Sequence, residues 1–171
     1  MASAKINIPP RIQPEKFQDP ELTSTGARRA SVELVALQTL WFNTGTLCNL
    51  ACANCYIDSS PTNDSLVYLQ LNEVRTFLDE ISTAKHLTTE IGFTGGEPFM
   101  NPDLMDMLML CLRRGFAVLV LTNATKPMMK CCDQLSAIQA RFPETLRVRV
   151  SLDHFSQEQH QIERGAHSWE P

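Results

Sequence analysis

The sequence predicts an α/β fold, specifically a partial (β/α) barrel of about four βα units with parallel strands. Short apolar runs alternate with stretches of helical periodicity, which is the order of a βα chain. The runs are continuous rather than alternating, as in strands that are covered on both faces. A closed eight-unit barrel takes about 250 residues, so a chain of 171 residues predicts an open sheet.

The apolar runs place the strands, and helical spacing with capping residues places the helices between them. The expected strands are residues 37–43, 90–94, 116–122 and 146–152. The first helix is expected over 73–85 with Asn72 as its cap, and the second from Asn101-Pro102 to Gly115. A third runs from Pro127 to Pro143, and Ser156 with Gln159 resembles a capping box for a fourth.

Composition excludes several classes of protein. With 43% hydrophobic and 20% charged residues the chain is typical of a globular domain. A net charge of −4 gives no electrostatic case for binding nucleic acid, and no apolar run approaches the length of a membrane span. No export signal precedes the six cysteines, so we expect reduced thiols and a cytoplasmic location. Residues 1–32 are expected to form an extended arm and 33–171 the core domain.

Cys48, Cys52 and Cys55 form a C-x3-C-x2-C loop directly after the first expected strand. Three thiolates on one loop can hold three irons of a [4Fe–4S] cluster, which usually takes four Cys ligands. One iron is then open to a further ligand. A zinc site would need a fourth Cys or His at suitable spacing, and three core cysteines without a metal remain an alternative.

Further polar residues follow the other expected strands. Gly95-Gly96-Glu97-Pro98 comes after the second, Asn123 after the third, and Ser151 and Asp153 lie around the end of the fourth. Ligands of open parallel sheets bind at the carboxyl ends of the strands. The sequence therefore predicts one site that all four strand ends share with the cysteine loop.

These motifs together resemble the radical S-adenosylmethionine (SAM) superfamily. The match comprises the three cysteines followed by Tyr56, the GGEP segment after the second strand, and Val150-Ser-Leu-Asp153. Residues 160–165, ending in Arg164-Gly165, resemble the branch of peptide-modifying maturases and the molybdenum-cofactor cyclase. The resemblance covers about residues 37–170, and the family core normally has about two further βα units.

The resemblance implies a [4Fe–4S] cluster on the three cysteines and SAM as the ligand of its open iron. It implies that Gly95, Gly96 and Glu97 meet the amino group of SAM, and that Pro98 fixes their turn. The remaining implied SAM contacts are Tyr56 near the adenine, Arg164 at the carboxylate, and Asn123, Ser151 and Asp153 around the rim. Reductive cleavage would give a 5′-deoxyadenosyl radical that takes hydrogen from a substrate.

Two functions follow as hypotheses. One is a radical SAM enzyme that needs an electron donor of the flavodoxin or ferredoxin type and acts on a small molecule or a peptide. The other is a non-catalytic iron–sulfur or zinc module, or an inactive fragment. The remaining thiols, Cys111, Cys131 and Cys132, are expected on helices, and the methionines at 105, 107 and 109 are expected to pack a helix rather than bind a cofactor.

Overall fold

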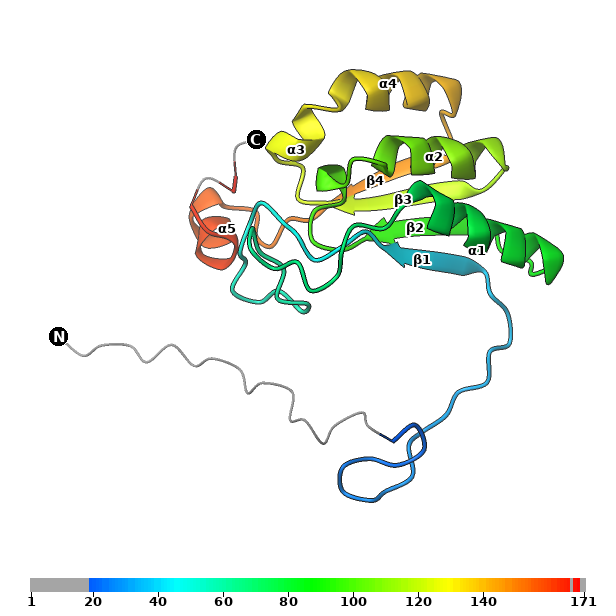
Figure 1. The fold of residues 1–171 in the computed structure, drawn as a ribbon. Coiled ribbons are helices and arrows are strands. Elements are labelled where there is room, and N and C mark those ends of the chain that lie inside the picture. The colour runs from blue at the N-terminus through cyan, green and yellow to red at the C-terminus, as the bar shows by residue number, and fades with distance from the viewer. Residues whose placement is uncertain (1–18, 167, 170–171) are drawn as a thin grey trace. The chain divides into compact units, whose positions relative to one another are not determined.

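The computed structural model describes residues 19–166, 168 and 169 of the 171-residue chain (Figure 1). Contacts divide the chain into two units, one ending at Val35 and the other starting at Ala36. In the first unit, Leu22 and Arg28 form an isolated antiparallel bridge, and the Asp19 carboxylate accepts hydrogen bonds from the two backbone N–H groups at Glu21 and Leu22. The predicted arm over 1–32 lies partly outside the described residues.

The second unit is built on a four-stranded parallel sheet in the order β1-β2-β3-β4. Its strands are β1 (Thr39–Asn43), β2 (Glu90–Thr94), β3 (Ala117–Thr122) and β4 (Leu146–Val150). The predicted fold is therefore confirmed, and the sheet is open. The expected β4 extended to residue 152, but the strand ends at Val150.

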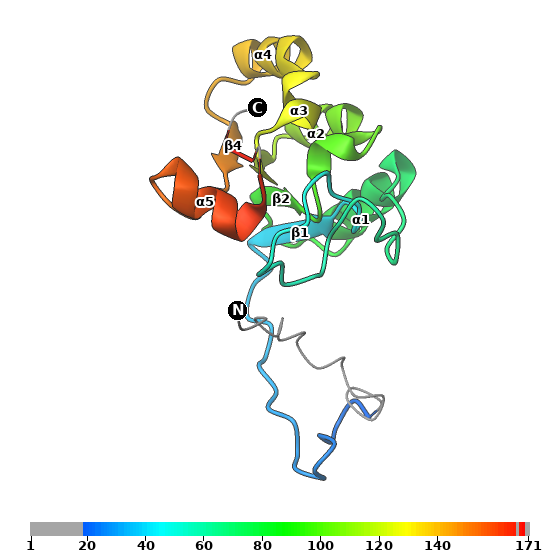
Figure 2. The ribbon, with the colours of Figure 1, turned by 90° about the vertical axis from the view of Figure 1, so that its left-hand side faces the viewer.

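All carboxyl ends of the strands point to one edge of the sheet, where the cysteine loop and α5 (Gln157–Arg164) also lie (Figures 1 and 2). The helices α1 (Leu71–Thr83), α2 (Leu104–Arg113) and α4 (Cys132–Arg141) cover one face of the sheet (Figure 1). Alternate residues of the inner strands, such as Ile91, Phe93, Val118 and Val120, are fully buried in the resulting core.

The starts of the first two helices differ from the predicted ones. Helix α1 begins after Gln70, whose backbone N–H donates to the Glu73 side chain at 2.7 Å, so Asn72 lies inside the helix. Asn101 does not cap α2, because it ends a short 3-10 helix, η1 (Pro98–Met100), and α2 starts after Asp103. The side-chain amide of Asn101 instead donates to the backbone oxygens of Thr44 and Leu69, which ties the loops containing these two residues together.

The third predicted helix is two helices, α3 (Lys126–Met129) and α4. The Cys131 N–H donates to Met128 O, three residues back, so the chain leaves the α-helical pattern there. Helical spacing would place Met128, Cys132, Leu135 and Ile138 on one face of a single helix, but only Ile138 is buried and the other three are partly exposed. Helix α5 begins at the expected place, but Ser156 forms no capping bond and its hydroxyl meets His154 Nδ1.

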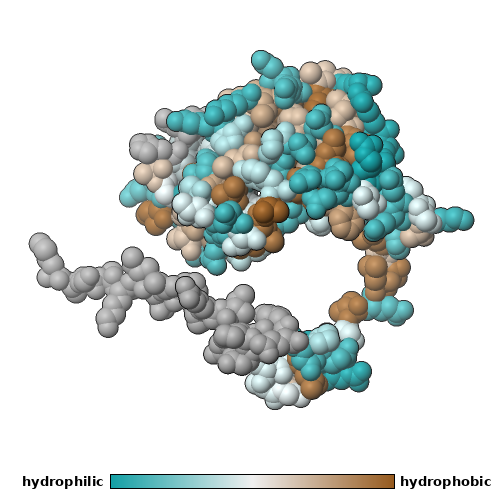
Figure 3. Space-filling view, in the orientation of Figure 1, coloured by the Kyte–Doolittle hydropathy of each residue, from teal (hydrophilic) through white to brown (hydrophobic). Residues whose placement is uncertain are grey.

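The other expectations about thiols and methionines agree better with the structure. Cys111 and Met107 are fully buried on α2, and Met105 and Met109 pack against the same core. The face drawn in Figure 3 shows hydrophilic and hydrophobic residues interleaved over the helical layer at its top. Within the described part of the chain, no helix has the length and apolar content needed to cross a bilayer.

Candidate functional site

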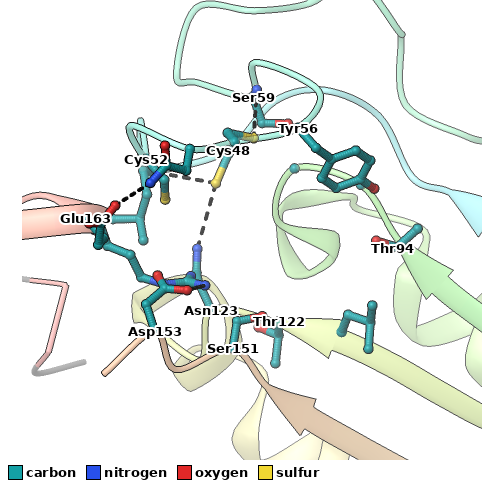
Figure 4. A pocket seen from close by; sticks show the side chains of 17 residues that line it. Cys48, Cys52, Tyr56, Ser59, Thr94, Thr122, Asn123, Ser151, Asp153 and Glu163 are labelled. Carbon is teal, nitrogen blue, oxygen red and sulfur yellow. Dashed lines mark hydrogen bonds and ion pairs between the residues drawn. The ribbon is translucent and has the colours of Figure 1, made fainter. Parts of the chain in front are cut away.

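A cavity of about 530 Å³ lies at the carboxyl edge of the sheet (Figure 4). Its lining comes from the cysteine loop, the ends of β2 and β3, the segment after β4, and the last turn of α5. Ten of the twelve predicted site residues line it: Cys48, Cys52, Cys55, Tyr56, Gly95, Gly96, Asn123, Ser151, Asp153 and Arg164. Glu97 and Pro98 do not line it and lie buried behind the glycines.

The cysteine loop is closed at its base by β-like contacts. Leu47 and Ser60 form a parallel bridge, and the Cys48 N–H donates to Ser60 O at 3.1 Å. Two backbone N–H groups also point at sulfur: Leu50 N donates to Cys48 Sγ at 3.4 Å and Ser59 N to Cys55 Sγ at 3.2 Å. Such N–H groups stabilise a thiolate over a thiol.

Burial acts in the opposite direction on these thiols. It raises the pKa of Cys48, against the lowering effect of the Leu50 N–H, and Glu97 and the other two cysteines raise it further. Burial also raises the pKa of Cys52, which the Arg164 guanidinium partly offsets. Both thiolates therefore need additional positive charge, and bound iron supplies such charge.

The donor set fits a [4Fe–4S] cluster. All three thiols are free, line one cavity and come from one loop. In the described ranges, no three His, Cys, Asp or Glu side chains are placed to hold a single metal ion. A cube does not require that arrangement, because each of its cysteines binds a different iron.

The glycine turn after β2 packs directly on the backbone before the cysteine loop. Gly96 N donates to Gly45 O at 2.8 Å. A Cβ at Gly96 would lie 2.1 Å from Leu47 O, and one at Gly95, where φ is +139°, would lie 2.7 Å from Gly45 O. Only glycine allows so close an approach.

Glu97 holds the floor of the cavity from behind. Its carboxylate accepts hydrogen bonds from Thr122 Oγ1 at 2.7 Å, Asn123 N at 2.8 Å and Phe99 N at 3.2 Å. Burial raises the pKa of this carboxyl, and these three hydrogen bonds and the Arg164 charge partly offset the rise. Glu97 is 1% exposed, and its hydrogen bonds with Thr122 and Asn123 join the turn after β2 to the end of β3.

Asn123 links the end of β3 to the cysteine loop. Its Nδ2 donates to Asn49 Oδ1 at 3.0 Å and lies 3.7 Å from Cys48 Sγ. Its Oδ1 accepts from the Thr125 hydroxyl at 2.6 Å. The next residue, Ala124, has φ +56°, a conformation that glycine adopts more easily.

The last turn of α5 closes the cavity from the other side. The Arg164 guanidinium pairs with the Asp153 carboxylate, so the two predicted site residues meet each other. The Ala53 N–H donates to Glu163 O at 3.0 Å, and the Asn54 amide donates to the Glu163 side chain. Tyr56 is 78% exposed and lies at the cavity mouth (Figure 4).

Sequence reasoning missed several lining residues: Leu50, Asn54, Ser59, Thr94, Leu121 and Glu163. Thr94 and Thr122 end strands β2 and β3, and their position alone points to the site. Ser59 and Glu163 belong to no motif, and only the folded chain brings them to the cavity.

A second cavity of about 900 Å³ adjoins the first at Leu50. It is lined partly by Lys126, Lys130 and Cys131 and contains none of the predicted site residues. The larger space is thus separate from the thiols that the loop brings together.

Comparison with known proteins identifies relatives of this arrangement. The chain is 32% identical over 118 residues to the antilisterial bacteriocin subtilosin biosynthesis protein AlbA of Bacillus subtilis (strain 168), covering 69% of this chain and 25% of that protein. The chain therefore spans about a quarter of the length of this relative.

Solved structures share the fold at lower identity. Streptococcus suis SuiB bound to S-adenosylmethionine superposes with a TM-score of 0.61 at 16% identity, over 78% of this chain and 29% of that one. SuiB bound to its precursor peptide SuiA gives 0.60 at 17% identity, over 76% and 27%.

The family model of the radical SAM superfamily matches residues 42–171. Proteins of this superfamily use a [4Fe–4S] cluster and SAM. The match begins inside β1 and includes the cysteine loop, the glycine turn and α5. This chain belongs to the radical SAM superfamily.

Proposed function

We propose that this chain is the cluster- and SAM-binding part of a radical SAM enzyme. The observation that carries the proposal is a single cavity that joins three free thiols to the glycine turn and to polar side chains after β3 and β4. A module that only holds a metal has no need of the glycine turn or of the polar side chains after β3 and β4.

Cys48, Cys52 and Cys55 would hold three irons of the cluster. The Leu50 and Ser59 N–H groups already point at two of these sulfurs and would stabilise them as thiolates. Such a cluster, with SAM bound and one electron supplied by a reductant, would supply reductive cleavage of SAM to methionine and a 5′-deoxyadenosyl radical for taking hydrogen from a substrate.

The glycine turn would receive the amino group of SAM. Gly95 and Gly96 line the cavity with main chain alone, so an ammonium can reach their carbonyl groups closely. The negative charge of the Glu97 carboxylate would attract the ammonium group of SAM. The same carboxylate accepts three hydrogen bonds, which keep the turn fixed. Pro98 starts η1 and would set the direction of the chain behind the turn.

The rim would bind the rest of SAM. Ser151, Asn123 and Tyr56 line the cavity and offer a hydroxyl, an amide and a ring. Arg164 would attract the SAM carboxylate, while Asp153 holds the guanidinium in place through their ion pair. The side chain of Arg164 is 14% exposed, so its charge is only partly screened by water.

The substrate is proposed from the relatives. AlbA is a protein of bacteriocin biosynthesis, and SuiB was solved with a precursor peptide. We therefore favour a peptide over a small molecule. The electron donor would be a reductant of the flavodoxin or ferredoxin type, and the cytoplasm is the proposed location because thiols stay reduced there.

Anaerobic reconstitution with iron and sulfide tests the function. The reduced protein is examined by electron paramagnetic resonance with and without SAM, beside a variant with all three loop cysteines changed to alanine. We expect a four-iron signal that shifts on adding SAM, and no such signal in the variant. Cys131→Ala is the matched control, since Cys131 lines the other cavity.

Three results would be informative against the proposal. A cluster whose signal ignores SAM would support the iron–sulfur module instead. Zinc bound in place of iron would support a zinc module. A cluster that survives loss of all three loop cysteines would show that they are not its ligands.

A further inference from the structure

Ser59 has an unusual side chain in this structure. Its Oγ is the one buried side-chain oxygen or nitrogen that lacks a hydrogen-bond partner among the residues that the structure describes. The residue is 5% exposed and lines the cavity that contains the three cysteines. Its backbone N–H donates to Cys55 Sγ at 3.2 Å, so the residue directly contacts that thiol (Figure 4).

A buried hydroxyl without a partner is unfavourable, because it gives up its hydrogen bonds to water and gains none in return. Neighbouring hydroxyl groups in the same loop do find partners. The Ser60 Oγ accepts from Thr62 N at 3.4 Å, and the Thr46 Oγ1 donates to Asn63 O at 3.0 Å. The loop therefore has the means to satisfy hydroxyls, and Ser59 is the exception.

We propose that the Ser59 hydroxyl donates a hydrogen bond to a sulfur of the bound [4Fe–4S] cluster and thereby raises its reduction potential. The inference rests on the proposed function, because it needs the cluster to be held by the three cysteines. It makes Ser59 a positioning and tuning residue rather than a ligand. Ser59 lines the cavity and its backbone N–H contacts Cys55 Sγ, so the residue lies beside the metal site, and its buried hydroxyl has no partner among the described residues.

The direction of the effect follows from charge. Reduction adds an electron, and part of the added negative charge resides on the sulfurs. A hydroxyl donor stabilises the more negative, reduced form more than the oxidised form. Hydrogen bonds to the sulfurs are among the factors that set the potentials of such clusters. Removing the hydroxyl therefore lowers the potential.

The test compares the reconstituted wild-type protein with Ser59→Ala, using Ser60→Ala as the matched control. Ser60 is the next residue of the same loop, and its side chain does not line the cavity. A redox titration followed by electron paramagnetic resonance, without SAM, gives the midpoint potential. For Ser59→Ala we expect about a tenfold smaller ratio of reduced to oxidised cluster at a given poise, equivalent to about 59 mV for one electron.

Unfolding of the metal-free proteins by urea gives a second readout. Because the hydroxyl has no partner in the protein, Ser59→Ala leaves the free energy of unfolding unchanged or raises it. A purely structural serine would behave in the opposite way, with lower stability and an unchanged potential.

Several outcomes would overturn the inference. Equal potentials in wild type and Ser59→Ala, with the cluster formed in both, remove it while leaving the proposed function intact. A change seen only in SAM affinity assigns the hydroxyl to SAM and also overturns it. If wild type forms no cluster, the proposed function itself fails and the inference with it.

Discussion

The two loops that bring main chain to the cavity differ in how they are held. The glycine turn after β2 is fixed by hydrogen bonds from Gly96 N and Glu97 N to the preceding loop, and its carboxylate is buried. The cysteine loop is tied at its base and at Ala53, but Cys52 and Cys55 are partly exposed. One side of the site is thus complete without a ligand, whereas the other depends on what its thiols bind.

The largest expected effect comes from a substitution in the glycine turn after β2, the side of the site that is fixed without a ligand. Gly96→Ala places a Cβ 2.1 Å from a backbone oxygen, so the turn and the loop must separate. We expect the free energy of unfolding to fall by about 3 kcal/mol or more, measured with urea on the metal-free protein.

Gly115→Ala is the control for that change. Gly115 has φ +87° but no atom within 4 Å of its added Cβ, so only the backbone conformation costs energy, about 1–2 kcal/mol. A loss at Gly96 no larger than the loss at Gly115 would contradict the expected clash with Leu47 O.

The second substitution affects only the cysteine loop, the side of the site that depends on what its thiols bind. Cys52→Ser alters a partly exposed side chain, so the metal-free protein should keep its stability within about 0.5 kcal/mol. Iron content after reconstitution should fall well below that of the wild type, because loss of a direct ligand costs more than the 10–100-fold in metal affinity that loss of an outer-shell partner costs. Cys131→Ser should lose no iron, and a large loss of stability in Cys52→Ser would contradict the contrast.

The third change sharpens the account of Glu97. Burial raises the pKa of Glu97 above its ordinary value of 4.5, so its favourable contribution to the free energy of unfolding is complete below about pH 4.5 and is lost as the pH rises through the folded-state pKa. Each pKa unit of the rise corresponds to about 1.4 kcal/mol. Between pH 4.5 and 7.5 the wild type should therefore lose stability relative to Glu97→Gln.

That comparison uses urea unfolding of both metal-free proteins over the same pH range, so that the other titrating groups cancel. Glutamine cannot accept from Asn123 N and Phe99 N on both of its terminal atoms, so we expect it to be less stable at low pH. Parallel pH profiles would contradict a raised pKa at Glu97.

The smallest expected effect concerns the ion pair between Arg164 and Asp153. Arg164→Gln removes the ion pair with Asp153, whose side chain is 41% exposed, so the loss should be at most about 1 kcal/mol. Screening should reduce the difference from wild type between 0.05 and 1 M salt. A loss that does not depend on salt would point to packing of the Arg164 stem instead.

The same contrast explains what the sequence could predict. Strands β2 and β3 lie within one residue of their predicted ranges, because continuous apolar runs have one stable environment in a covered sheet. Helix starts were wrong where several polar residues compete, as at Gln70 and Asn72. The break between α3 and α4 carries no proline or glycine at its centre, so the pattern gave no sign of it.

The site residues also divide into those that local sequence predicts and those that only the folded chain reveals. Residues of local motifs, such as the three cysteines and the two glycines, were identified because their spacing alone limits what they can do. The burial of Glu97 and the pairing of Arg164 with Asp153 depend on contacts between distant segments. Ser59 matters through the lack of a partner, and sequence alone cannot show which hydroxyls remain unpaired.

The hydrogen bond between Asn54 and Glu163 joins residues 109 positions apart. On a ribosome that adds about 5–20 residues per second, the cysteine loop is made roughly 5–20 s before α5 exists to cover it. During translation the three loop thiols therefore exist for an interval before the hydrogen bond between Asn54 and Glu163 can form. Iron–sulfur insertion and protection from oxidation then become questions of timing as well as of affinity.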